Sequence, residues 1–177
     1  MAILHKASVT PTKAEVLERF AGEAVTVLGT YRFDDPVGEV GVEAFVARYA
    51  ERTRQIVLTY RGAPLDGADA DLVSTMEHSV LGRRWIYDGT RDAVALACFR
   101  RALLGEQEQA GEEIWDQGQR VSVREPTVRL SVVPGRPPEA DAAPVIATDL
   151  DVSPADVPGP RLRAEWNGGE AIVASFG

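Results

Sequence analysis

Polar and aromatic side chains are densest between positions 77 and 88. These twelve positions hold two carboxylates, an imidazole, two guanidinium groups and two aromatic rings. A carbohydrate site needs an aromatic face beside planar hydrogen-bonding groups, and Arg offers bidentate geometry to a phosphate or carboxylate. The candidate ligand-binding residues are Glu77, His78, Arg83, Arg84, Trp85, Tyr87 and Asp88.

The same composition has a plainer interpretation. Trp85 and Tyr87 would then be half-buried residues of a sheet, and the arginines would pair with neighbouring acids. Because composition alone seldom marks a site, the residues themselves favour this interpretation over a binding site.

A second set of acids lies at Asp34, Asp35, Glu39 and Glu43. Glu39 and Glu43 fall on the same face of a predicted strand and could form a carboxylate pair for glycosidic chemistry. Alternating Glu on a strand is more often its solvated side, so we expect these two residues to face water.

No complete catalytic or metal-binding set is apparent, so we predict no catalytic residue, metal or cofactor. His5 and His78 are the only histidines, and their spacing does not suit a zinc site. Ser79 cannot readily use His78 as a base, because adjacent strand residues point to opposite faces. No glycine-rich loop of the nucleotide-binding type occurs. We expect Cys98 to be a small core residue.

The hydrophobic pattern predicts an α+β fold built on an antiparallel sheet. A strand is expected at 3–9, followed by a helix that a capping box at Thr12–Glu15 begins. Further strands are expected at 25–33, 38–49, 55–61, 72–76 and 82–88, with a turn at Arg52–Thr53, and short connections favour a meander. A second helix should begin after Asp92 and end near Gly105.

The C-terminal third should extend this fold with more strands. Residues 120–133 look like a long strand whose inward register changes at Glu125–Pro126, where a bulge or a break would explain the shift. Residues 134–160 have the Pro/Ala-rich composition of a linker or loop. Residues 161–177 predict a β-hairpin that packs on the main domain, which leaves 1–133 as the principal α+β domain.

Bulk properties limit the partners. The chain has 177 residues, a formal net charge of -8 and one cysteine. Nucleic acids and anionic membranes both favour clustered Lys and Arg, so neither is expected as a partner. A lone cysteine allows no internal disulfide, and no long apolar segment or leader is evident, so we expect a cytoplasmic protein.

The strings at 58–65 and 77–89 carry a family resemblance: LTYRGAPL, then EHSVLGRRWIYDG. With the opening residues 1–13, they closely resemble the N-terminal cap domain of actinobacterial maltokinases. The resemblance spans about residues 1–105 and implies a curved antiparallel sheet packed by helices, near maltose, trehalose and α-glucan metabolism. The family's catalytic residues lie outside the cap, so none is carried over. In maltokinases, a longer segment that contains Trp and Pro is common at the position of residues 28–33 of this chain.

Our leading hypothesis is a non-catalytic, cap-like binding or regulatory module for a sugar kinase or glucan enzyme, acting through protein contacts or a sugar ligand. The alternative is a small carbohydrate-active enzyme, of hydrolase or branching type, that uses Glu77, Asp88 or the Glu39/Glu43 pair. A third hypothesis is a structural partner or homodimer, which an apolar patch near Trp166 and Phe176 would favour.

Overall fold

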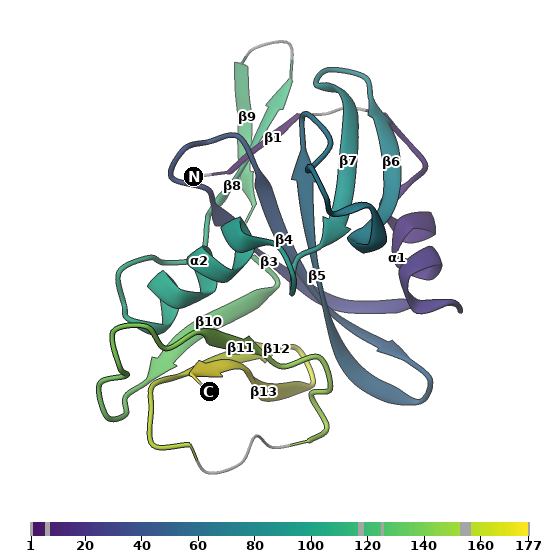
Figure 1. Ribbon diagram of the computed structural model, residues 1–177. Coiled ribbons are helices and arrows are strands. Elements are labelled where there is room, and N and C mark those ends of the chain that lie inside the picture. The colour runs from purple at the N-terminus through teal and green to yellow at the C-terminus, as the bar shows by residue number, and fades with distance from the viewer. Residues whose placement is uncertain (1, 6–7, 117–118, 125, 153–156, 177) are drawn as a thin grey trace.

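The fold is organised around a curled, antiparallel, six-stranded half-barrel sheet (Figure 1). The computed structural model describes residues 2–5, 8–116, 119–124, 126–152 and 157–176, and only the backbone of 2–5 and 112–124. The strand order is β2-β6-β7-β5-β4-β3. The strands are β2 (Val9–Thr10), β3 (Thr26–Asp34), β4 (Gly41–Tyr49), β5 (Arg52–Arg61), β6 (Leu72–His78) and β7 (Gly82–Asp88). A short 3-10 turn, Asp69–Asp71, precedes β6. The α+β class and the curved antiparallel sheet predicted from the sequence are confirmed. The meander holds for β3, β4 and β5 only, because β7 rather than β6 pairs with β5.

The helix α1 (Lys13–Ala21) covers one face of this sheet. Thr12 and Glu15 form the predicted capping box, and Gly22 ends the helix in a left-handed conformation with φ of 77°. Beneath α1 lies a compact apolar cluster formed by Val16, Leu17, Phe45, Ile56, Leu58, Met76 and Ile86. The spacing of Val16 and Leu17 places both on the face of α1 that meets the sheet.

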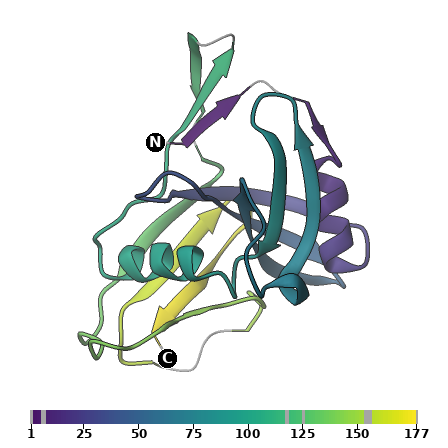
Figure 2. The same ribbon diagram turned by 45° about the horizontal axis from the view of Figure 1, so that its top comes forward.

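The helix α2 (Ala93–Leu103) packs on the opposite face of the sheet, between it and a second sheet (Figure 2). Asp92 is the N-cap and accepts a hydrogen bond from the Val94 amide. Cys98 and Phe99 are fully buried in this layer, as the sequence predicts. Tyr31, Phe33 and Phe99 pack edge to face.

The C-terminal strands form a four-stranded antiparallel sheet in the order β10-β12-β13-β11. They are β10 (Val128–Val133), β11 (Pro144–Ile146), β12 (Arg161–Trp166) and β13 (Gly169–Phe176). Leu162, Ala164, Val173 and Phe176 join the same core as α2 and the half-barrel. The predicted C-terminal β extension is therefore part of the main core.

Gln55 joins the two sheets at their centre. The Tyr31 hydroxyl donates to Gln55 Oε1 (2.5 Å), and Gln55 Nε2 donates to the carbonyls of Ala147 (2.9 Å) and Val173 (3.0 Å). Every polar atom of this buried amide thus has a partner, which offsets the cost of removing it from water. The segment 134–160 contains β11 and this contact at Ala147, and whether it separates two units stays a prediction.

Several local predictions were wrong in detail. Residues 120–133 are two strands in different sheets rather than one, because β9 (Gln119–Arg124) pairs with β8 (Glu112–Asp116) and β10 pairs with β12. Of the two explanations for the change of register, a bulge or a break, the structure shows the break. The predicted strand at 3–9 is also divided, since β1 (Ala2–His5) runs parallel to β8 while Val9 pairs with His78 in the half-barrel. The β4–β5 turn lies at Ala50–Glu51, both with positive φ, rather than at Arg52–Thr53.

Candidate functional site

The predicted cluster at 77–88 lies on the β6–β7 hairpin, where strand geometry divides it between two faces. Ile86 belongs to the core under α1, so Arg84 and Asp88 share the parity of that face. Arg83, Trp85 and Tyr87 have the opposite parity. Closeness in sequence therefore does not bring the seven candidate side chains into one site.

Glu77 and Arg83 form a solvent-exposed ion pair. The two residues are directly paired across the hairpin, and Arg83 Nε donates to Glu77 Oε1 at 2.6 Å. Their side chains are 59% and 60% exposed. An exposed pair of this kind contributes about 0–1 kcal/mol.

His78 and Arg84 close the turn between β6 and β7. His78 Nδ1 accepts hydrogen bonds from the amides of Val80 (3.2 Å) and Leu81 (3.1 Å). Arg84 donates to the Leu81 carbonyl at 3.0 Å. Both side chains thus have a local structural role.

The remaining candidates are also engaged in local structure. Tyr87 is buried, and its hydroxyl accepts a hydrogen bond from the Leu65 amide (2.8 Å). Asp88 Oδ1 accepts from the Thr90 amide (2.9 Å) and hydroxyl (2.7 Å), which fixes the turn after β7. Trp85 is half-buried. Ligand binding by these residues stays a prediction.

Glu43 overturns the expectation that the acids of β4 face water. The Glu43 residue is only 3% exposed, because its side chain points to the face that α1 covers, whereas Glu39 lies exposed in the β3–β4 turn. Lys13 Nζ lies 2.7 Å from Glu43 Oε2, and Arg32 lies 3.5 Å from Oε1. Burial alone would raise the pKa of Glu43, but Arg32 and Lys13 together hold it below its ordinary value. Glu43 is therefore a buried carboxylate kept ionised by two cations.

Asp92 is a second buried carboxylate with fixed partners. Its Oδ2 accepts hydrogen bonds from the Thr59 hydroxyl (2.7 Å) and Arg61 Nε (2.8 Å), and Oδ1 accepts from a terminal nitrogen of Arg61 (2.6 Å). Burial would raise the pKa of Asp92, but the hydrogen bonds from Arg61, Thr59 and Val94 lower it. The sequence predicted the N-cap role and missed the bidentate Arg61 pair.

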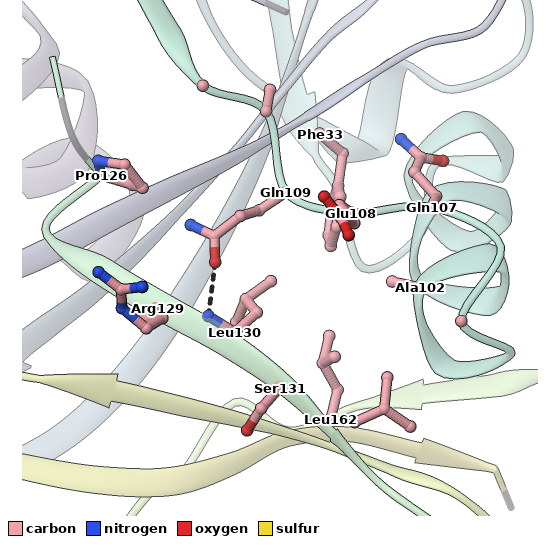
Figure 3. Close-up of a pocket in the computed structure, with 14 residues that line it drawn as sticks. Phe33, Ala102, Gln107, Glu108, Gln109, Pro126, Arg129, Leu130, Ser131 and Leu162 are labelled. Carbon is pink, nitrogen blue, oxygen red and sulfur yellow. Dashed lines mark hydrogen bonds between the residues drawn. The ribbon is translucent and has the colours of Figure 1, made fainter.

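A surface cavity of about 470 Å³ lies between β10 and the segment that follows α2 (Figure 3). Phe33, Ala102, Leu130 and Leu162 contribute apolar surface to it. Glu108, Arg129 and Ser131 add polar groups. A smaller hollow of about 300 Å³ lies near α1 and includes Asp71, Asp88, Arg19 and Arg91. Asp88 is the one predicted candidate that borders either cavity.

Two glutamines beside the larger cavity join the edges of the two sheets. Gln107 Nε2 donates to the Asp34 carbonyl at the edge of β3 (2.7 Å). Gln109 donates to the Val128 carbonyl (2.8 Å) and accepts from the Leu130 amide (2.5 Å) at the edge of β10 (Figure 3). The sequence showed that residues 106–113 are rich in Gln. It gave no sign that these side chains would hydrogen-bond to the backbone at the edges of β3 and β10. These amides stabilise the fold and are not free for a ligand.

The carboxylates that the enzyme hypothesis names lie in different surroundings, and of these Asp88 alone borders one of the two cavities. Glu39 is exposed in a turn, Glu43 is buried under α1, and Glu77 lies on the far hairpin. A glycosidase needs two carboxyl groups roughly 5–10 Å apart across a cleft, one of them poised as an acid. Among the described residues, no group of three His, Cys, Asp or Glu side chains is placed to hold a metal.

The aromatic residues that were expected to form an exposed apolar patch, Trp166 and Phe176, instead pack in or against the main core. Phe176 is buried in the main core, with Arg100 stacked 5.6 Å from its ring centre, and Trp166 packs against that core. These aromatic residues hold the C-terminal sheet in place. No helix in the described part of the chain is long and apolar enough to cross a membrane.

Comparison with known proteins finds a family match in the N-terminal part of the chain. Residues 17–92 match the family model of the maltokinase N-terminal cap domain. The matched segment includes β3 to β7, most of the curled sheet. Searches of the curated proteins and of the solved structures found no significant match.

Proposed function

We propose that this chain, whose residues 17–92 form a maltokinase N-terminal cap domain, is a non-catalytic module that binds and regulates a sugar kinase in the cytoplasm. The single observation that carries the proposal is the family match over the curled sheet. It associates the chain with maltokinases and thus with maltose and trehalose metabolism. A maltokinase is the first partner to test, and another α-glucan enzyme is the next.

The positions of the acids support a non-catalytic role. Glu43 and Asp92, the most buried carboxylates described, are each paired with cations of the framework. A catalytic acid instead needs a raised pKa and access to substrate. Both carboxylates have the opposite character, because their pKa values are lowered and their oxygens are occupied.

The alternative of a small carbohydrate-active enzyme gains nothing from this arrangement. Glu77 is exposed and paired with Arg83, and Asp88 accepts hydrogen bonds from Thr90. A sugar ligand without catalysis remains compatible with the module, since the cavity of about 470 Å³ is within the usual size of a small-molecule site.

The proposal is tested by titrating the purified chain into a purified maltokinase from the same organism. We expect a saturable complex by calorimetry and a change in the rate of maltose phosphorylation. The chain alone, incubated with maltose and ATP or with glycogen, should give no product. A complex that fails to form at micromolar concentrations would overturn the binding role, and turnover by the chain alone would overturn the non-catalytic role.

The same experiment includes a test of sugar binding. Maltose, trehalose and glycogen are added to the chain without kinase, and thermal unfolding is recorded. A shift that depends on sugar concentration would show that the module also senses a sugar. A matched variant, Arg129→Gln at the larger cavity, would show whether that cavity is where the sugar binds.

A further inference from the structure

β10 is an edge strand of the C-terminal sheet, and a side chain rather than a strand lies against one end of its outer edge. β12 pairs with β10 along the inner side. In an antiparallel pair, the amide and carbonyl of every second residue point away from the partner strand. Gln109 shows which residues these are, because its carboxamide binds the Val128 carbonyl and the Leu130 amide from outside the sheet. By the same alternation, the Leu130 carbonyl and both backbone groups of Val132 also point outward.

The other end of this edge is open. Within the described part of the chain, the Leu130 carbonyl and the Val132 amide and carbonyl have no hydrogen-bond partner. Val132 is 39% exposed. Pro134, which follows the end of β10, has no amide and therefore ends the edge. These adjacent backbone groups are available to a strand that does not belong to this sheet.

The cavity of about 470 Å³ lies directly against the open end. β10 forms one wall of it, and the segment that follows α2 forms the other (Figure 3). Ala102 and Leu162 give it an apolar floor, and Leu162 is the cross-strand partner of Val132. A residue that pairs with Val132 from outside would place its side chain on the same face, beside Leu162. The open backbone groups and the apolar floor therefore suit one and the same residue of a ligand.

These features favour an extended peptide over a sugar. A sugar ring binds best against an exposed aromatic face, but Phe33, the aromatic residue of the cavity, is only 2% exposed. The cavity presents instead a row of backbone groups with the two-residue period of a strand. Such a row pairs with another peptide backbone, while the pocket beside it selects a side chain.

The surroundings of the edge favour a single peptide over a second copy of the chain. The segment that follows α2 is fixed beside the edge, because the Gln107 side chain and the Ala110 amide bind carbonyls of β3. A strand of a second copy would bring its neighbouring strands with it and would meet this segment, whereas a lone extended chain needs only a spacing of about 4.8 Å from β10. Glu106 and Glu108 lie exposed on the same segment and favour a peptide with basic residues.

We infer that the outer edge of β10, from Leu130 to Val132, binds an extended, basic peptide segment of another protein as an additional antiparallel strand. One apolar side chain of the peptide enters the cavity. The amide of the same peptide residue donates to the Val132 carbonyl, and its carbonyl accepts from the Val132 amide. The antiparallel direction is that of every strand pair in this sheet. The inference does not depend on the kinase partnership, since it rests on the backbone of β10 and on the cavity.

The first experiment changes the peptide and leaves the protein intact. The probe is acetyl-Lys-Thr-Val-Thr-Val-Thr-Lys-amide, titrated into the isotope-labelled chain and followed by NMR. We expect saturable shifts at the Val132 amide. In antiparallel pairing, the peptide residues whose amides face β10 also turn their side chains to the cavity. N-methylation of both Val residues should therefore raise Kd by about fivefold or more, since hydrogen bonds to β10 are lost. N-methylation of two Thr residues is the matched control and should leave Kd unchanged, because these amides face away.

The outcomes of this titration decide the inference. Equal Kd values for the two methylated peptides would overturn strand addition. Loss of binding on methylation of Thr alone would overturn the antiparallel direction. Absence of shifts at Val132 with millimolar peptide would overturn the site. Binding of maltose at these residues without binding of the peptide would overturn the peptide in favour of a sugar.

A second experiment changes the edge itself. Val132→Pro removes an outward amide and no bond to β12, and proline is tolerated on an edge strand in that position. Val132→Thr is the matched control, because it keeps the amide and the branched shape. Val132→Pro should weaken peptide binding by about fivefold or more, and Val132→Thr should bind as the native chain does. Equal affinities of the two variants, with unchanged thermal unfolding, would contradict the edge contact. A dimer of the native chain that Val132→Pro dissociates would overturn the peptide partner in favour of a second copy.

Discussion

Two ion pairs of the half-barrel have nearly the same length and very different surroundings. Arg83 and Glu77 lie 2.6 Å apart on an exposed hairpin, and both side chains are more than half exposed. Lys13 and Glu43 lie 2.7 Å apart, but the Glu43 side chain is only 4% exposed. Dense polar composition drew attention to the first pair, whereas helix α1 makes the second structurally decisive. The burial that a helix imposes therefore matters more than the number of charges in a stretch of sequence.

The largest expected effect is that of Glu43→Gln. This change leaves Lys13 and Arg32 beside a neutral amide in a buried place, and breaking a buried pair usually costs about 3–5 kcal/mol. Because Lys13 is 41% exposed and regains some hydration, we expect a loss near the lower bound, roughly 3 kcal/mol. The measurement is the free energy of unfolding in urea at pH 7. A loss below about 1 kcal/mol would place Glu43 with the exposed pairs.

Asp92→Asn should follow, with a loss of about 2 kcal/mol, because the charged partner of Arg61 is removed while an Asn can still cap α2. Asp88→Asn is the matched control, since Asp88 is only half-buried and its hydrogen bonds come from the neighbouring Thr90. The same urea titration compares them. If both changes cost the same, the bidentate Arg61 contact contributes little to stability.

Acid should weaken the buried pairs. The pKa of Glu43 is lowered from its ordinary value of 4.5, and that of Asp92 from 3.8. A lowered pKa in the folded state means that the unfolded chain binds protons more readily as pH falls. The stabilisation is therefore complete above about pH 4.5 and is lost as pH falls through the folded pKa values.

Unfolding free energies between pH 3 and pH 7 test this expectation. Glu43→Gln should flatten the acid slope, because the residue no longer titrates. Phe45→Leu is the control, since it weakens the same apolar cluster without changing any titrating group. An unchanged slope in Glu43→Gln would show that other carboxylates dominate the acid response.

The sequence was a good guide to local structure and a poor guide to side-chain surroundings. The capping box at Thr12, the N-cap at Asp92 and the C-terminal hairpin depend on neighbouring residues, so pattern alone predicted them. The burial of Glu43 depends on α1 crossing β4, a contact thirty positions away in sequence. The separation of β9 from β10 likewise depends on a distant contact, because β10 pairs with β12 while β9 pairs with β8 just before it.

The candidate cluster at 77–88 shows the same limit. The match of residues 17–92 to the maltokinase cap model confirms the resemblance that this string carries. A family pattern reflects the tertiary structure shared by its members, whereas amino-acid composition does not. The roles of its residues could not be read from the same string. His78 closes a turn through backbone amides, and no side-chain spacing announces such a contact.

The smallest expected effect concerns the exposed pair of the comparison. Glu77→Gln and Arg83→Gln should each change the free energy of unfolding by less than about 0.5 kcal/mol, because water replaces the lost partner. A double-mutant cycle in urea isolates the coupling between the two side chains, and 0.5 M salt should reduce it further. A coupling above about 1.5 kcal/mol would mean that this hairpin is more rigid and less hydrated than its exposure indicates. The contrast with Glu43 would then come from the number of cations around each carboxylate rather than from burial.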